Sequence, residues 1–502
     1  MAAKYILAHD LGTSGDKASL FTTDGDFVAT VTTGYPKTSF PDGGVEQDPE
    51  DWWKAFCLST KQLLANIDPH DILVVGFDGT FPCCLCLDSH GNKLHNAFIW
   101  QDVRAAAESM ELEAAMPKDW MSTFTNSRIG ADKTLPKLLW IKRHWPEMFE
   151  RIAMVLPSSQ DFLVRRLTGE TVTDCRGASG SRMINEDRTA WYPGALDLLG
   201  MKVSQLPRLV NRTDIVGGIL PEIAEECGLV AGTPVVAGTG DSLAADVGVG
   251  LLDIGDAYFT GGTSGGIYGM MDVDGRPTRC GGEASACGAS YAWLKDVICT
   301  QEQAEAARTG VSVYDLINEQ AAAAPIGSHG VMFHPHLSGE RFPRFNGMAQ
   351  GSFVGISVTT TRADLIRSVI EGIGFNVALI MDFVRERGVN PRRIPIVGGL
   401  GTSPVTRQIF ADIMNVELEV PRYPAEVATM GTAILAGIAI GVFANEREGY
   451  ERFHDVASIT YPNPSNVEMY QALRPIFDGI YHGLEPMYPD IYATRKWLSE
   501  QS

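Results

Sequence analysis

A four-residue turn sequence, Gly-Thr-Ser-Gly, occurs twice in this 502-residue chain, and each copy lies between two strand-like segments. The first copy occupies residues 12–15, within ILAHDLGTSGDKASLF, and the second occupies residues 262–265, within GDAYFTGGTSGGIYG. The copies lie about half a chain apart. Two related halves that face a cleft would bring both turns against one ligand. The repeat therefore predicts two domains that divide near residue 247.

The first turn has two interpretations. Glycine-containing loops of this length commonly join antiparallel strands, so the segment could be a plain hairpin. Alternatively, the turn could hold a phosphate group, because glycine lets the backbone approach an anion and the Thr13 and Ser14 hydroxyls could complete the ring of donors. Asp10, at the end of the preceding strand, could then hold Mg2+ beside that phosphate. The choice depends on what the rest of the chain supplies.

The charge balance limits the classes of partner. A formal net charge of −20 argues against nucleic acid or an anionic membrane surface. It does not exclude a nucleotide, because backbone N–H groups and a metal can bind phosphates. The nine cysteines lack paired spacing, which favours reduced thiols and no cysteine metal site. With no apolar leader and no run long enough to span a bilayer, we expect a cytoplasmic protein.

Several elements can be placed from local signals. Asp48 and Pro49 mark the start of a helix, and residues 103–170 have a mainly helical pattern. PVVAGTGDSLAADVGVG reads as a strand, a glycine-rich turn and a small-residue helix. Thr361, with Asp364 three residues later, predicts the start of a long helix that stops at Gly388. IPIVGGLGTS predicts a strand that runs into a turn, and EVATMGTAILAGIAIGVF predicts a closely packed helix.

These segments together resemble the FGGY carbohydrate kinase family, and xylulokinase-like members in particular, within the actin-like ATPase superfamily. The similar pieces follow the family's order over nearly the whole chain: DLGTSGDK, GTGDSLAAD, TGGTSG, HPHLSGERFPRFN with TRADLIRSVIEGIGF, VVGGLGTSPVTRQIFADIM and EVATMGTAILAG. The resemblance implies an α/β fold of two actin-like (ribonuclease H-like) domains, each a mixed sheet flanked by helices, facing a central cleft. Residues 1–247 would carry the sugar site, the first phosphate loop and the catalytic aspartate. Residues 248–502 would carry the second phosphate loop and the adenosine site.

The resemblance also implies roles for individual residues. Asp241 would be the general base that accepts the proton of a sugar hydroxyl during phosphoryl transfer, although an acid here could also simply cap the next helix. Asp10 would act through Mg2+. The residues implied to contact ATP are Thr13, Ser14, Lys17, Gly262, Thr263, Ser264, Gly399 and Ser403.

The sugar end departs from the family pattern. Where xylulokinases typically carry Gln-Met-His, this chain has Thr80-Phe81-Pro82, and the Arg-Glu pair of glycerol kinases is absent as well. IWQD at 99–102 is closer to the family form. Trp100 could pack on sugar carbons and Asp102 could accept hydrogen bonds from sugar hydroxyls. The alternative is that Trp100 is a core residue and Asp102 a turn residue. The residues implied to contact the substrate are Phe81, Pro82, Trp100, Asp102, Asp241 and Ser242.

We therefore expect an ATP-dependent kinase for a small sugar, polyol or sugar acid, with a pentulose such as xylulose favoured. A kinase for gluconate, glycerol, a tetritol or another ketose is the alternative within the family. The protein could also form a homodimer. A different class is also open: a nucleotide-dependent binding protein of the actin or heat-shock-chaperone type. The GTGDSL acid and the SGERFP region favour the kinase.

Overall fold

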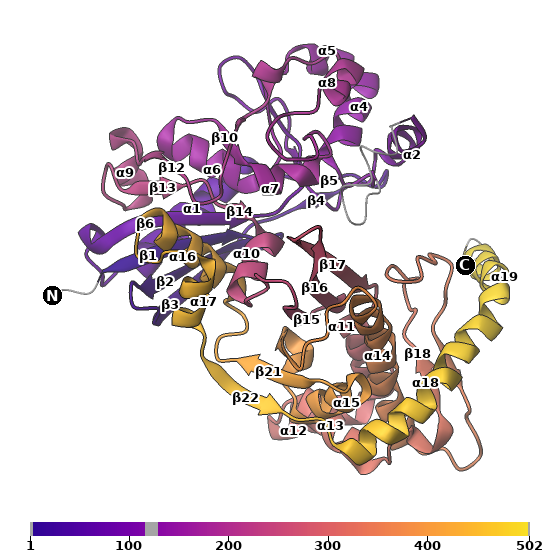
Figure 1. Ribbon diagram of the computed structural model, residues 1–502. Helices are drawn as coiled ribbons and strands as arrows, with labels where there is room; N and C mark the ends of the chain where they lie inside the picture. The colour runs from indigo at the N-terminus through magenta and orange to yellow at the C-terminus, as the bar shows by residue number, and fades with distance from the viewer. Residues whose placement is uncertain (1–3, 116–128, 500–502) are drawn as a thin grey trace. The chain divides into compact units, whose positions relative to one another are not determined.

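The computed structural model describes residues 4–115 and 129–499, which form two compact units (Figure 1). Unit 1 comprises Met1–Gly250 and Glu426–His454, and unit 2 comprises Leu251–Ala425 and Asp455–Ser502. The chain leaves unit 1 close to the predicted division at residue 247. It differs from that division in one segment, because residues 426–454 return to unit 1.

Unit 1 is built on a mixed sheet whose strand order is β12-β13-β6-β1-β2-β3, with β14 also pairing with β6. β1 runs antiparallel to β2 and parallel to β6, and the apolar sequence of β6 suits a strand that is buried on both faces. The strands are β1 (Tyr5–Leu11), β2 (Gly15–Thr22), β3 (Phe27–Gly34), β6 (Ile72–Gly79), β12 (Ile215–Gly218), β13 (Pro234–Val236) and β14 (Thr239–Gly240).

The remaining elements of unit 1 are helices and short strands. The helices are α1 (Pro49–Leu63), α2 (Ala106–Ala115), α4 (Thr134–His144), α5 (Pro146–Glu150), α6 (Ser159–Thr168), α7 (Cys175–Ala178), α8 (Pro193–Leu199), α9 (Pro221–Cys227), α10 (Asp241–Gly248), α16 (Val427–Ala439) and α17 (Glu446–Phe453). The short strands are β4 (Thr38–Ser39), β5 (Val45–Gln47), β7 (Leu85–Leu87), β8 (Ala97–Phe98), β9 (Met154–Leu156), β10 (Val172–Asp174) and β11 (Arg208–Val210).

Local predictions for unit 1 are largely confirmed. Asp48 caps α1 by accepting a hydrogen bond from the N–H of Glu50, as its position before Pro49 predicts. The mainly helical pattern over 103–170 is confirmed for α2, α4, α5 and α6, while residues 116–128 of that region lie outside the described residues.

Helix α16 packs on the sheet of unit 1 and against α10, and Figure 1 shows it in gold beside the indigo strands β1 and β6. Two glycines permit this approach. A Cβ at Gly248 would lie 1.8 Å from the carbonyl oxygen of Val427, and a Cβ at Gly431 would lie 1.9 Å from that of Ala244. The small residues of EVATMGTAILAG thus bring the 427–439 helix into contact with the helix that begins at Asp241.

We predict that Gly431→Ala destabilises the protein by about 1–3 kcal/mol or more, because the new methyl group would overlap backbone atoms that cannot rotate away. Gly479→Ala is the matched control, since Gly479 also lies inside a helix but has no atom within 4 Å of its Cβ position. That control should be neutral or stabilise by up to about 1 kcal/mol. Urea denaturation midpoints measure both, and equal midpoints would contradict the packing argument.

Unit 2 repeats the plan of unit 1. Its sheet order is β17-β16-β15-β20-β21-β22, with β15 antiparallel to β16 and parallel to β20, as β1 is to β2 and β6. The predicted pair of strand–turn–strand units is therefore confirmed. The sheet strands are β15 (Ala257–Gly261), β16 (Gly265–Val273), β17 (Arg276–Ala284), β20 (Arg393–Val397), β21 (Glu417–Pro421) and β22 (Val456–Thr460).

The remaining elements of unit 2 are mainly helical. They are α11 (Gly288–Trp293), α12 (Thr300–Thr309), α13 (Val313–Ala323), α14 (Arg362–Arg385), α15 (Pro404–Met414), α18 (Pro464–Leu484) and α19 (Tyr488–Ser499), with a small hairpin of β18 (Met332–His334) and β19 (Ser352–Val354). Within the described ranges, every helix is too short or too polar to cross a bilayer.

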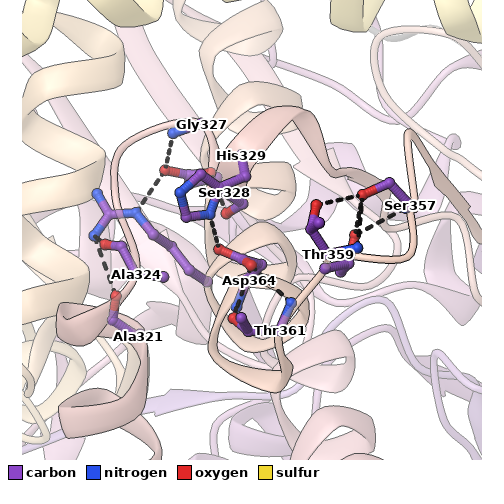
Figure 2. A network of polar contacts seen from close by, with 12 residues as sticks. Ala321, Ala324, Gly327, Ser328, His329, Ser357, Thr359, Thr361 and Asp364 are labelled. Atoms are coloured by element: carbon purple, nitrogen blue, oxygen red, sulfur yellow. Dashed lines mark hydrogen bonds and ion pairs between the residues drawn. The ribbon is translucent and has the colours of Figure 1, made fainter.

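The start of α14 is fixed by the polar network in Figure 2. Thr361 and Asp364 form the predicted capping box, in which each side chain bonds to the other residue's backbone N–H. The ring of His329 contacts the Asp364 carboxylate at 2.8 Å, and this network holds the preceding loop to the helix. The long helix predicted from Thr361 is thereby confirmed.

His334, at the end of β18, is expected to make the stability of unit 2 depend on pH. Its ring is fully buried and stacks on Phe477 with 4.2 Å between ring centroids. Burial, reinforced by His336 and Arg344, lowers the pKa of His334 from 6.5 to about 3. Between those values the unfolded chain binds a proton that the folded chain excludes, so stability should fall as the pH falls, by about 1.4 kcal/mol per pH unit.

The check is a series of urea titrations from neutral pH to pH values of about 4. In His334→Gln the free energy of unfolding should depend less steeply on pH than in the wild type, because one proton fewer is taken up on unfolding. His90→Gln removes an exposed histidine and is the control for the loss of an imidazole. Identical slopes in all three proteins would contradict the role of His334.

Candidate functional site

The turn between β1 and β2 is held from outside by three side chains. The Tyr35 hydroxyl donates to the carbonyl of Gly12 at 2.5 Å, and the Gln47 amide donates to the carbonyl of Thr13 at 2.8 Å. The indole N–H of Trp100 donates to the Thr13 hydroxyl at 3.0 Å. The turn is therefore a hairpin whose shape is fixed by neighbouring loops. Thr13 and Ser14 both lie within it, and Lys17 is the Cα partner of Asp10 in the antiparallel register of β1 and β2.

Three polar residues form a row across the ends of neighbouring parallel strands. Asp10 on β1 and Asp78 on β6 are direct partners in the strand register, and Thr239 on β14 is the partner of Asp78 on its other side. Burial is the main cause that raises the pKa of the Asp10 carboxyl and, still more, that of Asp78, to which the nearby Asp10 charge also contributes. Two buried acids thus lie together at the end of the sheet.

Asp241 begins α10, directly after β14, and is half-buried. The position of this helix start is fixed from two sides. Asp174 accepts a hydrogen bond from the Thr239 hydroxyl at 2.6 Å. The Phe81 ring lies against Gly240, where a Cβ would come within 2.0 Å of the ring. The predicted residues Phe81 and Asp241 are thereby brought close together, with Ser242 next to Asp241 on the first turn of the helix.

The sugar-loop residues differ in exposure. Trp100 is 41% exposed, which leaves much of its indole ring open for a ligand. Asp102 is fully buried, and its carboxylate accepts from the Arg104 guanidinium at 2.6 Å and from the N–H of Val45 at 3.0 Å. Arg104 also pairs with Glu46 at 2.7 Å. The geometry of Asp102 is that of a residue that holds its loop. Pro82 is buried directly after Phe81.

Sequence reasoning missed Asp78, Arg104 and Lys137. Asp78 had a usable signal, because it ends an apolar strand as Asp10 does. Lys137 on α4 is buried, and its ammonium donates to the carbonyls of Ile99 at 2.6 Å and Asp132 at 2.8 Å. Burial lowers the pKa of Lys137 to about 8. Lys137 supports the backbone just before Trp100 by its hydrogen bond to the carbonyl of Ile99. No local sequence pattern predicts this role.

The second turn, in unit 2, is also anchored by its surroundings. The N–H groups of Gly288 and Ala289, at the start of α11, donate to the carbonyls of Gly262 and Thr263. The Ser264 hydroxyl donates to Glu283 at 2.7 Å. A side chain at Gly288 would overlap the Gly262 carbonyl, so the close approach of α11 to the turn requires glycine there.

A cavity of about 600 Å³ opens beside this turn within unit 2. Predicted residues Gly262, Thr263, Gly399 and Ser403 line it, while Ser264 is turned towards Glu283. Its other walls are Gly261, Gly288, Tyr291, Ala292, Ser312, Tyr314, Asp315, Asn318, Leu400, Thr402 and Pro404. The size is in the range of small-molecule sites, and the glycines in its lining carry no side chain that would cover the backbone.

Comparison with known proteins supplies the family. The FGGY family of carbohydrate kinases matches by its N-terminal domain at residues 5–248 and by its C-terminal domain at residues 263–440. A xylulose kinase of Escherichia coli strain K12 is 32% identical over 95% of this chain and 99% of its own. A gluconokinase of Bacillus subtilis strain 168 is 28% identical over 98% of this chain and 99% of its own.

Solved structures of carbohydrate kinases are also similar to this chain. The ligand-bound xylulose kinase from Lactobacillus acidophilus has a TM-score of 0.88 at 26% identity, and the match covers 97% of this chain and 100% of that one. That match supports the predicted α/β fold of two mixed sheets flanked by helices. Both family models and the full-length relatives lead to one conclusion: this chain is a carbohydrate kinase and belongs to the FGGY family.

Proposed function

We propose that this protein transfers the γ-phosphoryl group of ATP to a primary hydroxyl of a small sugar, with a pentulose such as xylulose as the favoured acceptor. The observation that carries the proposal is the half-buried carboxylate of Asp241, held at the start of α10 by Phe81 and by the Thr239–Asp174 hydrogen bond. The full-length similarity to xylulose kinases supports a pentulose.

Asp241 is the proposed general base. A sugar hydroxyl is a weak nucleophile, and a carboxylate within hydrogen-bond reach can orient it and accept its proton as the phosphoryl group transfers. The positive end of the α10 dipole favours a negative charge at this position. The rigid contact between Phe81 and Gly240 supports the role, because proton transfer depends on a fixed distance between base and hydroxyl.

ATP is proposed to bind in unit 2 through the cavity beside the second turn. Gly262 and Thr263 would approach the phosphates, and Gly399 and Ser403 would lie against the adenosine. Ser403 caps α15 by accepting from the N–H of Val405 at 3.2 Å, which fixes the end of the GGLGTSP turn. In unit 1, Thr13, Ser14 and Lys17 are proposed to approach the transferred phosphate.

Mg2+ is proposed to bind beside Asp10. When bound, it would neutralise charge that develops on the β- and γ-phosphate oxygens. The residues fit a hard cation, since Asp10 Oδ1 is buried and has no hydrogen-bond donor among the described residues. The protein is strongly acidic, so a cation is the natural means to bring phosphates next to these carboxylates.

At the sugar end, Trp100 is proposed to pack on sugar carbons, and Phe81, Pro82 and Ser242 to shape the space beside Asp241. For Asp102, the buried pairing with Arg104 supports a positioning role, in which it fixes the loop that carries Trp100. Gluconate is the second candidate acceptor, because gluconokinases are also similar over the full length of the chain.

An acceptor panel tests the proposal. ADP release is measured with ATP and Mg2+ and one of D-xylulose, D-ribulose, D-gluconate, glycerol or erythritol. We expect the highest kcat/KM with a pentulose. A higher value with gluconate would transfer the assignment to the second candidate. ATP hydrolysis at one rate with every compound and with none would reject the proposed function in favour of a nucleotide-dependent binding protein.

A further inference from the structure

We propose that Asp78 is a second carboxylate ligand of the metal site at Asp10, either directly or through one metal-bound water. The inference rests on the proposed function, because it concerns the cation that accompanies ATP. It adds a residue that lies on a different strand from Asp10, about 70 residues further along the chain.

The strand register places the two acids side by side. Asp10 and Asp78 are Cα partners in the parallel pairing of β1 and β6, so their side chains project from the same face of the sheet. Both stand at the carboxyl ends of their strands, where ligands of open α/β sheets bind. Asp10 is the more exposed of the two, and Asp78 is fully buried.

Two carboxylate oxygens of the acid pair have no hydrogen-bond donor among the described residues. Asp78 Oδ2 accepts a hydrogen bond from the Thr432 hydroxyl of α16 at 2.5 Å, which fixes the orientation of the carboxylate. Asp78 Oδ1 and Asp10 Oδ1 are both buried and have no donor among the described residues. The two carboxyl groups share a hydrogen bond, for which one of them must carry a proton, since ionised carboxylates can only accept. That shared proton still leaves both Oδ1 atoms without a donor in the described part of the chain. A cation held between them would satisfy both.

The chemistry of the pair selects the kind of cation. Carboxylate oxygens are hard ligands, and Mg2+ is commonly held by one or two carboxylates together with water and substrate phosphates. Lys17, opposite Asp10 in the register, is the positive side chain that most strongly offsets the charge of Asp10. The single positive charge of Lys17 does not neutralise two ionised carboxylates, so the pair can still bind a divalent cation.

The test is direct metal binding without turnover. Mn2+ replaces Mg2+ at oxygen sites and its free form is counted by electron paramagnetic resonance. The full-length protein is titrated with Mn2+ in the presence of ADP and without sugar. We expect Asp78→Asn to weaken Mn2+ binding by about 10- to 100-fold, the usual effect of removing a group that supports a metal. ADP affinity measured in EDTA should be unchanged.

Asp161→Asn is the matched control. Asp161 is also a fully buried acid of unit 1 with an oxygen that lacks a donor among the described residues, but its charged neighbour is Asp174 rather than Asp10. Its Mn2+ affinity should equal that of the wild type. Thr432→Val keeps both carboxylates and removes only the hydroxyl that orients Asp78, so it should weaken Mn2+ binding several-fold.

Each outcome decides the proposal. Mn2+ affinity within twofold of the wild type in Asp78→Asn would overturn it and would give Asp78 a purely structural role. If Asp78→Asn does not fold, Thr432→Val decides in the same way. The acceptor panel is independent of this result: failure of every sugar would reject the proposed function, while metal binding at the acid pair would still be measured.

Discussion

Asp241→Asn should lower kcat for sugar phosphorylation by about 100- to 10,000-fold, while the protein stays folded and its KM values for ATP and sugar change little. The substitution preserves the size and shape of the side chain but removes the ability to accept a proton. The start of α10 should keep its place, because Phe81 and the Thr239–Asp174 hydrogen bond hold it independently of the charge. Steady-state kinetics and a thermal melt of the same preparation give both parts of the answer.

Asp246→Asn is the control for this variant. It removes the same charge from the same helix five residues further along, and it should retain kcat within a few-fold of the wild type. Near-normal kcat in Asp241→Asn would show that the residue only caps α10. Equal losses of kcat in both variants would show that catalysis depends on the total negative charge of α10 and not on Asp241 as a general base.

Asp10→Ala should lower the Mg2+-dependent kcat by at least about 100-fold, which is the scale of losing one group that stabilises charge in the transition state. Sugar affinity, measured by calorimetry without nucleotide, should change far less. The folded protein should melt at an equal or higher temperature, because the substitution removes a carboxylate that is poorly solvated where β1 ends.

Thr13→Val is the comparison for Asp10→Ala. It removes a hydroxyl from the turn but leaves the backbone N–H groups, so its loss of kcat should be smaller and its Mg2+ dependence unchanged. The decisive quantity is the Mg2+ concentration that gives half-maximal kcat in each protein. If Asp10→Ala has the same Mg2+ dependence as the wild type, the turn is a plain hairpin and the metal binds elsewhere.

Local signals predicted the parts of this fold that local physics determines. The two hairpins around residues 12–15 and 262–265, the Asp48 cap of α1 and the Thr361–Asp364 capping box all depend on residues within a few positions of each other. Such contacts form whatever the distant chain does, so the sequence pattern is sufficient to find them.

The features that sequence reasoning missed depend on distant residues. The helix from 427 was predicted, but its return to unit 1 depends on Gly431 meeting the backbone of α10. Asp78 ends an apolar strand, but its place beside Asp10 follows only from the register in which β6 pairs with β1. Asp102 resembles a sugar ligand by position, and only the approach of Arg104 and Val45 shows that its carboxylate is already engaged.

The most direct test of the account is the identity of the phosphorylated atom. The wild-type protein is incubated with ATP, Mg2+ and the sugar that gives the highest kcat/KM in the panel, and the product is observed by proton-coupled 31P NMR. The account predicts a phosphate monoester signal split into a triplet by the two protons of a primary carbon, formed in equal amount to ADP. A doublet from a secondary ester, or inorganic phosphate alone at a rate that does not depend on the sugar, would contradict it.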